Sequence, residues 1–230
     1  IFDPQDPARY FSFMGQRADR NPVELIKTEL SDNEYKLLDW DGTVRLNILP
    51  GLNTQVTYSN QYVGSFGGYF LPSTNTKTNM SEANRSYGQT DKSAVEWLVN
   101  YNKSFGDHSV KAMAGYSWQS ITNSGFSATN KQFANDGTTY NSLGQGEWGL
   151  EEGHDGTSSY KNNSKLIAFF GRLNYDYMSK YLLTLSLRYE GSSKFGINNK
   201  WGYLPAVSAG WRMSKENFMS CCSGWLNDLK

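Results

Sequence analysis

Tyr181-Leu182-Leu183-Thr184-Leu185-Ser186-Leu187-Arg188-Tyr189-Glu190 is the stretch of sequence that decides the fold. Tyrosine and leucine occupy its odd positions, whereas threonine, serine, arginine and glutamate occupy the even positions from 184 onward. A period of two over this length predicts a β-strand whose two faces meet different media. The odd row begins and ends in tyrosine with leucine between, which is the order expected where a strand crosses a lipid layer and aromatic rings lie at both interfaces.

Six other segments alternate between apolar and polar residues in the same way. They cover 36–49, about 52–62, 95–102, 110–119, 167–177 and 203–212. Charged residues in the strand interiors lie on the polar parity: Glu96, Lys111, Arg172, Asp176, Arg188 and Arg212. Lys103, His108 and Lys165 lie on the apolar parity, but at predicted strand ends. A cation on a lipid-facing side costs roughly 2–4 kcal/mol at mid-membrane and about 0–1 kcal/mol near the interface, so these positions fit membrane-spanning strands.

Short turns alternate strictly with long connections along the chain. The turns lie near 50–51, 106–108, 178–180 and 214–217, and the long polar segments are 63–92, 122–164 and 191–202. Bacterial outer-membrane barrels have tight periplasmic turns at one end and extended extracellular loops at the other. We therefore expect the three long segments to be extracellular.

These patterns predict an all-β chain: an antiparallel up-and-down meander of about eight strands, forming a curved part of a large transmembrane β-barrel. Residues 1–33 are expected to be a lead-in segment and periplasmic turn, and 34–218 the barrel segment. Residues 219–230 are expected to be the truncated start of the next turn or strand. The chain lacks an initiator Met and a signal segment, so we expect it to be a piece of a longer protein.

Composition argues against nucleic-acid binding and against a membrane-spanning helix. The 22 basic and 22 acidic residues balance, which gives no electrostatic reason to expect nucleic acid. The mean hydropathy is −0.63, and the sequence has no apolar run near the roughly 18 residues that a membrane helix needs. The two cysteines, Cys221 and Cys222, are neighbours and are interpreted as turn residues, with a metal or redox pair as the alternative.

A soluble β-sandwich or lipocalin-like barrel is the main structural alternative, because its strands also alternate. Two features count against it. Tyrosine and tryptophan gather at the ends of the apolar rows, whereas a core places its bulk in the middle, and long loops are unusual in a compact soluble domain.

Four segments resemble the SusC/RagA family of TonB-dependent outer-membrane transporters, densely between 166 and 218. They are Phe170-Gly171-Arg172-Leu173-Asn174-Tyr175-Asp176-Tyr177, Lys180-Tyr181-Leu182-Leu183-Thr184, Arg188-Tyr189-Glu190-Gly191-Ser192-Ser193-Lys194-Phe195-Gly196 and Asn199-Lys200-Trp201-Gly202-Tyr203-Leu204-Pro205-Ala206-Val207-Ser208-Ala209-Gly210-Trp211-Arg212. The match is looser at Asn21-Pro22, Lys103-Ser104-Phe105-Gly106 and Ala114-Gly115-Tyr116-Ser117-Trp118-Gln119. The chain departs from the family's usual pattern at Tyr189-Glu190 and Leu204-Pro205-Ala206, where the alternation is kept.

The resemblance implies a plugged barrel of about 22 strands in the bacterial outer membrane. It also implies a SusD-like surface lipoprotein as a lid, TonB acting through N-terminal regions missing here, membrane lipid around the barrel, and an oligosaccharide or peptide as cargo. Import of this kind needs no bond broken and no cofactor, so we expect no enzyme.

Three sets of residues are candidate sites. Arg172, Asn174, Asp176 and Arg188, with Thr184 and Ser186, would line the lumen and contact cargo or plug, or would only pair with one another. Asn199, Trp201 and Tyr203 would bind a sugar by stacking and amide hydrogen bonds, although a loop folded for structure is the favoured interpretation. Glu151, Glu152 and Asp155, with Glu147 and His154, would hold calcium in the extracellular loop, although a solvated acidic loop is favoured because the spacing fits no calcium motif.

Two rival functions follow from the alternative folds. The first is a secreted or surface β-protein that acts as a carbohydrate-binding or adhesion module. The second is a surface hydrolase, which would need paired carboxylates across a cleft, with Glu151 and Glu152 as the residues to test.

Overall fold

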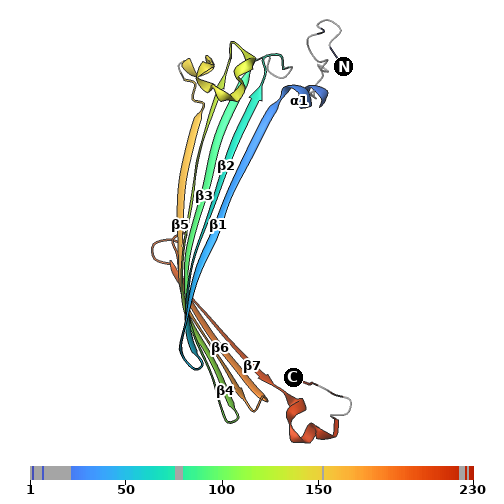
Figure 1. The fold of residues 1–230 in the computed structure, drawn as a ribbon, viewed down its shortest axis with the longest axis vertical. Helices are drawn as coiled ribbons and strands as arrows, with labels where there is room; N and C mark the ends of the chain where they lie inside the picture. The colour runs from blue at the N-terminus through green and yellow to red at the C-terminus, as the bar shows by residue number, and fades with distance from the viewer. Residues whose placement is uncertain are drawn as a thin grey trace. The chain divides into compact units, whose positions relative to one another are not determined.

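In the part of the chain that the structure describes, seven antiparallel strands form a single sheet whose spatial order is the chain order, β1-β2-β3-β4-β5-β6-β7 (Figure 1). The computed structural model describes residues 22–75, 80–151, 153–222 and 228–230, together with Phe2, Pro7 and Leu226. The predicted up-and-down meander is confirmed, with seven strands in place of about eight, and the sheet is not closed.

The strands differ in length. Five are long: β1 (Leu30–Leu49), β2 (Leu52–Leu71), β3 (Glu82–Phe105), β4 (His108–Lys131) and β5 (Thr157–Tyr177). β6 (Tyr181–Ser192) and β7 (Trp201–Trp211) are about half as long. A short helix α1 (Pro22–Thr28) precedes β1; the 3-10 helices η1 (Asp136–Asn141), η2 (Leu143–Gln145) and η3 (Trp148–Leu150) lie between β4 and β5, and η4 (Met213–Lys215) and η5 (Asn217–Cys222) follow β7.

Three of the four predicted short turns lie where the sequence predicts them, at 50–51, 106–107 and 178–180, whereas the predicted turn at 214–217 falls in the segment of the 3-10 helices η4 and η5. Gly51 and Gly106 have φ of +85° and +58°, a region that glycine enters without a steric penalty. The β5–β6 turn at 178–180 is closed by Lys180, whose N–H donates to the Tyr177 carbonyl at 2.9 Å. Its Ser179 N–H donates to the Asp176 carboxylate at 2.7 Å, which satisfies a turn amide.

The long connections are shorter than predicted, and this is the main correction. The strands continue through most of 63–92 and 122–164, which leaves connections of 72–81 and 132–156, and the segment 191–202 shrinks to 193–200. A sequence alternates between apolar and polar residues only where the two faces of a strand meet different media. Backbone hydrogen bonding between strands has no such requirement, so the strands continue into segments without alternation. Polar side chains join the outer parts of the strands: Asn84 Nδ2 donates to Thr129 Oγ1 at 2.7 Å and Thr90 Oγ1 to Asn123 Oδ1 at 2.7 Å.

Short helices lie near both ends of the described chain. Pro22 is the first residue of α1, a position where its missing N–H costs nothing. Helix α1 ends one residue before β1 begins, so it adjoins the end of β1 opposite the 50–51 turn. Residues 219–222 are 3-10 helix, and no described residue after them is in a strand.

The chain divides into two compact units, and β1–β5 contribute residues to both. Unit 1 comprises 1–38, 62–90 and 122–162, and unit 2 comprises 39–61, 91–121 and 163–230. Unit 1 holds a small apolar core of Phe70, Ala83 and Phe133. No helix in the described part of the chain is long and apolar enough to cross a membrane.

Candidate functional site

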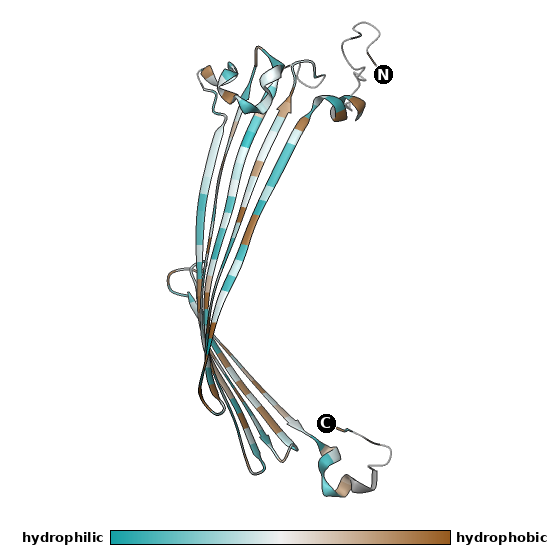
Figure 2. Ribbon diagram, in the orientation of Figure 1, coloured by the Kyte–Doolittle hydropathy of each residue, from teal (hydrophilic) through white to brown (hydrophobic). Residues whose placement is uncertain are grey.

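In unit 2 the sheet has two chemically distinct faces, and the candidate site lies on the polar one. We call the side that carries Thr184, Ser186 and Arg188 the polar face, and the side that carries Leu183, Leu185 and Leu187 the apolar face. The hydropathy alternates along β6 and β7 in Figure 2. The β5–β6 register pairs Arg172 with Ser186, Asn174 with Thr184 and Asp176 with Leu182, so the predicted lumen residues share the polar face.

Four of these side chains are already engaged in local contacts. Thr184 Oγ1 donates to Asn174 Oδ1 at 2.9 Å. The Arg188 guanidinium forms a close ion pair with Glu190, two residues away on the same strand, and lies 5.5 Å from the centroid of the Phe170 ring. Asp176 accepts the turn amide of Ser179.

Arg172 differs from its neighbours. Its side chain is exposed on the polar face, and no ion pair joins its guanidinium to another described residue. A free guanidinium presents five donors in a fixed fork, which suits carboxylates and hydroxyls. Among the predicted lumen residues, Arg172 is therefore the one most available to a ligand.

A groove of about 570 Å³ lies on the polar face of unit 2, near the short turns. Its polar lining comes from four strands and the last residue of the chain: Ser109, Lys111, Asn174, Asp176, Thr184, Ser208 and Lys230. Sequence reasoning placed Lys111 on this face but did not single it out, because its proximity to β5 and β6 depends on the strand register.

A second polar ladder joins β1 to β2 in unit 2, and it was missed as a candidate. Arg45 donates to Gln55 Oε1 from Nε at 3.0 Å and from Nη2 at 2.6 Å. Thr43 and Thr57 share a hydroxyl hydrogen bond of 2.9 Å, and Gln61 donates to Asp39 at 3.2 Å. The parity of Asp39, Thr43 and Arg45 in the sequence was the signal that could have found this ladder.

The apolar face of unit 2 is left uncovered. Leu183, Leu185 and Leu187 are 36%, 39% and 49% exposed, although they form the most apolar row of the strand. The register extends this row across three strands, since Leu185 lies opposite both Leu173 and Val207. At about 25 cal/mol per Å², exposing such a row to water is unfavourable, so another apolar medium is expected to cover it.

Aromatic residues bound this apolar row at both ends. Tyr181 lies opposite Tyr177 and Trp211, and Tyr189 lies opposite Phe169 and Tyr203. The two rows are eight positions apart on β6, which is roughly 26 Å at about 3.3 Å per residue. This spacing is close to the ~25 Å apolar band of outer-membrane barrels, measured before strand tilt is considered.

The candidate sugar residues do not join the lumen candidates. Trp201 and Tyr203 are on the apolar face, where both stack on Tyr189, with ring centroids 4.7 and 4.4 Å apart. Trp201 also covers Gly191, since a Cβ on that glycine would lie 2.6 Å from the indole. Asn199 is exposed in the 193–200 connection, so these residues and Arg172 do not form one site.

The acidic candidates of segment 132–156 are engaged locally. Asp155 Oδ1 accepts the Thr157 N–H and hydroxyl, both at 2.9 Å, and these bonds hold the pKa of the Asp155 carboxyl below its usual value. Glu151 lies 3.3 Å from His154 Nδ1, which also contacts the Trp148 carbonyl. Glu152 lies outside the described residues. Among the described residues, no group of three His, Cys, Asp or Glu side chains lies close enough together to hold a metal ion.

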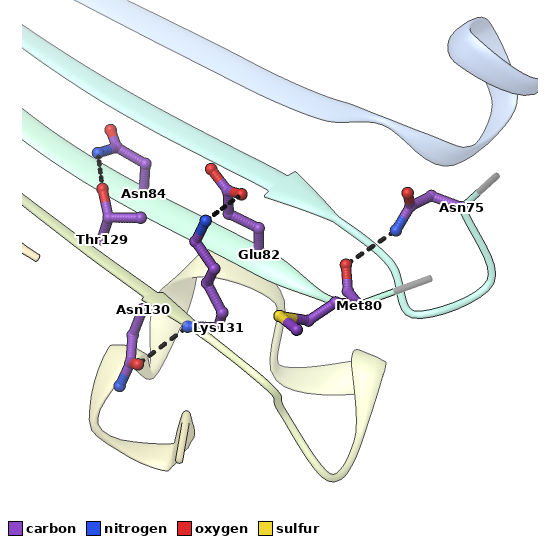
Figure 3. Close-up of polar contacts among 7 residues, drawn as sticks. All are labelled: Asn75, Met80, Glu82, Asn84, Thr129, Asn130 and Lys131. Atoms are coloured by element: carbon purple, nitrogen blue, oxygen red, sulfur yellow. Dashed lines mark hydrogen bonds and ion pairs between the residues drawn. The ribbon is translucent and has the colours of Figure 1, made fainter. Parts of the chain in front are cut away.

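Segment 132–156 has a defined conformation, and hydrogen bonds to the Asn130 side chain hold it in place. The Asn130 side chain donates to the carbonyls of Leu143 and Gly146, and its Oδ1 accepts the Gly149 N–H at 2.9 Å. Figure 3 shows the neighbouring polar contacts, with Lys131 paired to Glu82 at 3.2 Å and Asn84 bonded to Thr129. Tyr140 of this segment packs against Gly68 and donates to Asp32 of β1.

Comparison with known proteins identifies the fold family. The family model for the TonB-dependent receptor-like β-barrel matches residues 3–219. The chain belongs to this family.

Relatives of the receptor barrel agree with this assignment. TonB-dependent receptor P3 of Formosa agariphila is 35% identical over 201 residues, which cover 86% of this chain and 20% of that protein. TonB-dependent receptor SusC of Bacteroides thetaiotaomicron is 28% identical over 228 residues, covering 92% of this chain and 20% of SusC. The chain therefore spans about a fifth of the length of these relatives.

A solved structure has the same fold. The RagAB peptide transporter superposes with a TM-score of 0.82 over 92% of this chain and 23% of the transporter chain, at 17% identity. The seven strands thus form part of the wall of a TonB-dependent receptor barrel.

At the short-turn end of this receptor barrel segment, Glu216 joins three elements. Its carboxylate accepts the Tyr181 hydroxyl at 2.7 Å and the Trp211 indole N–H at 3.2 Å, and it lies 3.0 Å from Lys180 Nζ. The Tyr181 hydrogen bond, followed by those from Lys180 and Trp211, lowers the pKa of Glu216 below its ordinary value. Glu216 therefore ties the β5–β6 turn to the end of β7.

We expect Glu216→Gln to destabilise this corner in a pH-dependent way. Because the folded-state pKa is lowered, the charged carboxylate stabilises the fold above its unfolded pKa of about 4.3, and this contribution is lost as pH falls through the folded value. Urea unfolding of the full-length receptor from pH 7 to pH 3 should show a wild-type advantage that disappears in acid. An advantage that persists unchanged at pH 3 would show that the charge is not the cause.

Proposed function

We propose that this chain forms part of the wall of an outer-membrane importer for a bulky nutrient, an oligosaccharide or a peptide. The apolar face would contact membrane lipid and the polar face would line the lumen. In this proposal a SusD-like surface lipoprotein acts as the lid, and TonB supplies energy through regions outside this chain. The protein would act as a passage and binding surface, with no bond broken and no cofactor.

One observation carries the proposal: the leucines of β6 at 183, 185 and 187 are exposed, whereas Thr184 and Ser186 between them are half-buried. A soluble sandwich or lipocalin-like barrel would cover this row with a second layer. Aromatic rows at both ends match the interfaces of a bilayer, where tyrosine and tryptophan place their polar groups in the headgroup region.

The polar face supports a polar cargo. Arg172 offers free donors, and the Arg45–Gln55 and Thr43–Thr57 pairs offer a dense array of amide, guanidinium and hydroxyl groups. Such groups hydrogen-bond equally well to sugar hydroxyls and to peptide amides. The chemistry of the wall therefore fits both cargo classes, and the likeness to the RagAB peptide transporter makes peptides one class to test.

Deleting the full-length gene is expected to abolish uptake of one cargo class while leaving the other unchanged. Fluorescent oligosaccharides and peptides of matched size would be compared in the deletion strain and in the strain with the gene restored. The protein should fractionate with the outer membrane, require detergent for extraction and co-purify with a lipoprotein. Recovery of the intact protein in the soluble fraction would instead support the adhesion-module alternative.

A further inference from the structure

A small pocket in unit 1 combines aromatic walls with charged groups of both signs. Its volume is about 220 Å³, and its lining comes from strands β1, β2 and β3 and from the 132–156 segment. The lining includes Asp32, Glu34, Phe66, Gly68, Arg85 and Tyr140. All of these residues belong to unit 1, so the pocket is separate from Arg172 and from the groove of unit 2.

Tyr140 forms one wall of this pocket, and two contacts hold it there. Its ring covers Gly68, where an added Cβ would lie 2.7 Å from the ring. Its hydroxyl donates to the Asp32 carboxylate, and this bond raises the pKa of the Tyr140 hydroxyl above its ordinary value, so the hydroxyl stays protonated. The ring is therefore fixed in position, although Tyr140 lies in a connection between strands.

Phe66 of β2 forms a second aromatic wall. Its side chain is 39% exposed, and its ring centroid lies 4.8 Å from that of Tyr87 on β3. The Lys36 ammonium lies 5.3 Å from the Phe66 ring centroid and 3.2 Å from the Glu34 carboxylate. The pocket therefore offers an accessible ring surface with an ion pair at its edge.

Arg85 of β3 is the polar group of the pocket that is most available to a ligand. Its side chain is exposed, and its guanidinium lies 5.8 Å from the centroid of the Tyr140 ring. No hydrogen bond or ion pair joins it to another residue that the structure describes. A guanidinium has five N–H donors and stays charged, so Arg85 can donate to ligand oxygens without giving up an existing bond.

The mixture of charges indicates the class of ligand. An anion would be attracted by Arg85 but repelled by Asp32 and Glu34, and a cation would meet the opposite conflict. A sugar hydroxyl is neutral, and it can accept from a guanidinium and donate to a carboxylate at the same time. The aromatic walls suit the apolar C–H face of a sugar ring, and the small volume suits one ring rather than a chain.

We propose that this pocket binds a single neutral sugar residue of an oligosaccharide at the extracellular end of the receptor. The sugar ring packs against Phe66 and Tyr140. Arg85 donates to the sugar oxygens, and the carboxylates of Asp32 and Glu34 accept from its hydroxyls. This inference deepens the proposed function by naming oligosaccharides as a ligand class, and it rests on that function for the extracellular location.

Isothermal titration calorimetry of the full-length receptor in detergent tests the binding. The neutral probes are maltohexaose, laminarihexaose and mannohexaose, with hexagalacturonic acid as the charged counterpart and an uncharged hexapeptide as the counterpart without sugar. We expect at least one neutral probe to bind with a dissociation constant below about 1 mM, and more tightly than the charged or peptide probe. Binding of the charged or peptide probe alone, or of no probe, would overturn the assignment.

Two substitutions with matched controls locate the bound sugar. Arg85→Gln removes the charged donor and should weaken binding about tenfold, and Phe66→Leu removes the ring but keeps an apolar side chain and should weaken it about fivefold. Lys161→Gln and Phe126→Leu change an exposed cation and an exposed phenylalanine of unit 1 outside the pocket lining. Neither control should change the affinity.

The outcomes separate this inference from the proposed function. If Arg85→Gln and Phe66→Leu bind the sugar as tightly as the parent, the sugar binds elsewhere, so the pocket assignment is wrong and the importer proposal stands. If both substitutions weaken binding but deletion of the gene leaves oligosaccharide uptake unchanged, the pocket assignment is correct and import of oligosaccharides is wrong.

Discussion

Replacing Leu185 with arginine is expected to lower the unfolding free energy of the assembled receptor by about 2–4 kcal/mol. Leu185 lies at the centre of the apolar face, opposite Leu173 and Val207 and four residues from each flanking tyrosine of β6. A guanidinium there would be too far from either interface to reach it without distorting the strand. The measurement is reversible denaturant unfolding of the full-length protein in lipid bilayers.

Ser208→Arg is the matched control for this substitution. Ser208 lies opposite Thr184 on the polar face, one position from Val207, and borders the groove that contains Asp176. The same charge at almost the same depth should therefore change the unfolding free energy by less than about 1 kcal/mol. Equal losses for Leu185→Arg and Ser208→Arg would contradict the assignment of the two faces.

The central parts of the strands could be predicted because two media impose their pattern on the sequence. Every second residue from Leu183 to Leu187 is apolar, and the structure places all three leucines on one uncovered face. The outer parts of β3–β5 carry no such pattern, since most of their residues are polar. Side-chain hydrogen bonds such as Thr90 to Asn123 and Ser127 to Ser158 join residues about 30 positions apart, and no local sequence pattern predicts them.

The sequence predicts which face of the sheet carries the candidate site residues. It does not predict which other residues their side chains contact. Parity placed Arg172, Asn174 and Asp176 together correctly. It could not distinguish the free Arg172 from Arg188, which is paired with Glu190, because that distinction depends on rotamers and neighbours. The Tyr140–Asp32 bond spans 108 positions of sequence and depends on how segment 132–156 packs, so no sequence pattern could have found it.

Gly51→Ala is expected to destabilise the receptor by about 2–4 kcal/mol, because two penalties coincide there. Its φ of +85° strains any residue with a Cβ, and that Cβ would lie 2.1 Å from the backbone carbonyl oxygen of Asn102. A rigid carbonyl cannot move aside as a side chain would. The Gly51 carbonyl also accepts the Asn102 N–H at 2.7 Å, so any shift weakens the bond between the β1–β2 turn and β3.

Two other glycines separate the strain from the clash. Gly106 has a positive φ of +58°, and an added methyl group would meet no atom within 4 Å, so Gly106→Ala should cost only the backbone strain, about 1–2 kcal/mol. Gly42 has neither feature, and Gly42→Ala should be neutral or stabilising by up to about 1 kcal/mol. In denaturant unfolding, the free energy of unfolding should therefore be lowest for Gly51→Ala, intermediate for Gly106→Ala and highest for Gly42→Ala. If Gly51→Ala and Gly106→Ala lost the same stability, the Asn102 carbonyl would not be the obstacle, and the register between the 50–51 turn and β3 would have to differ from the one described.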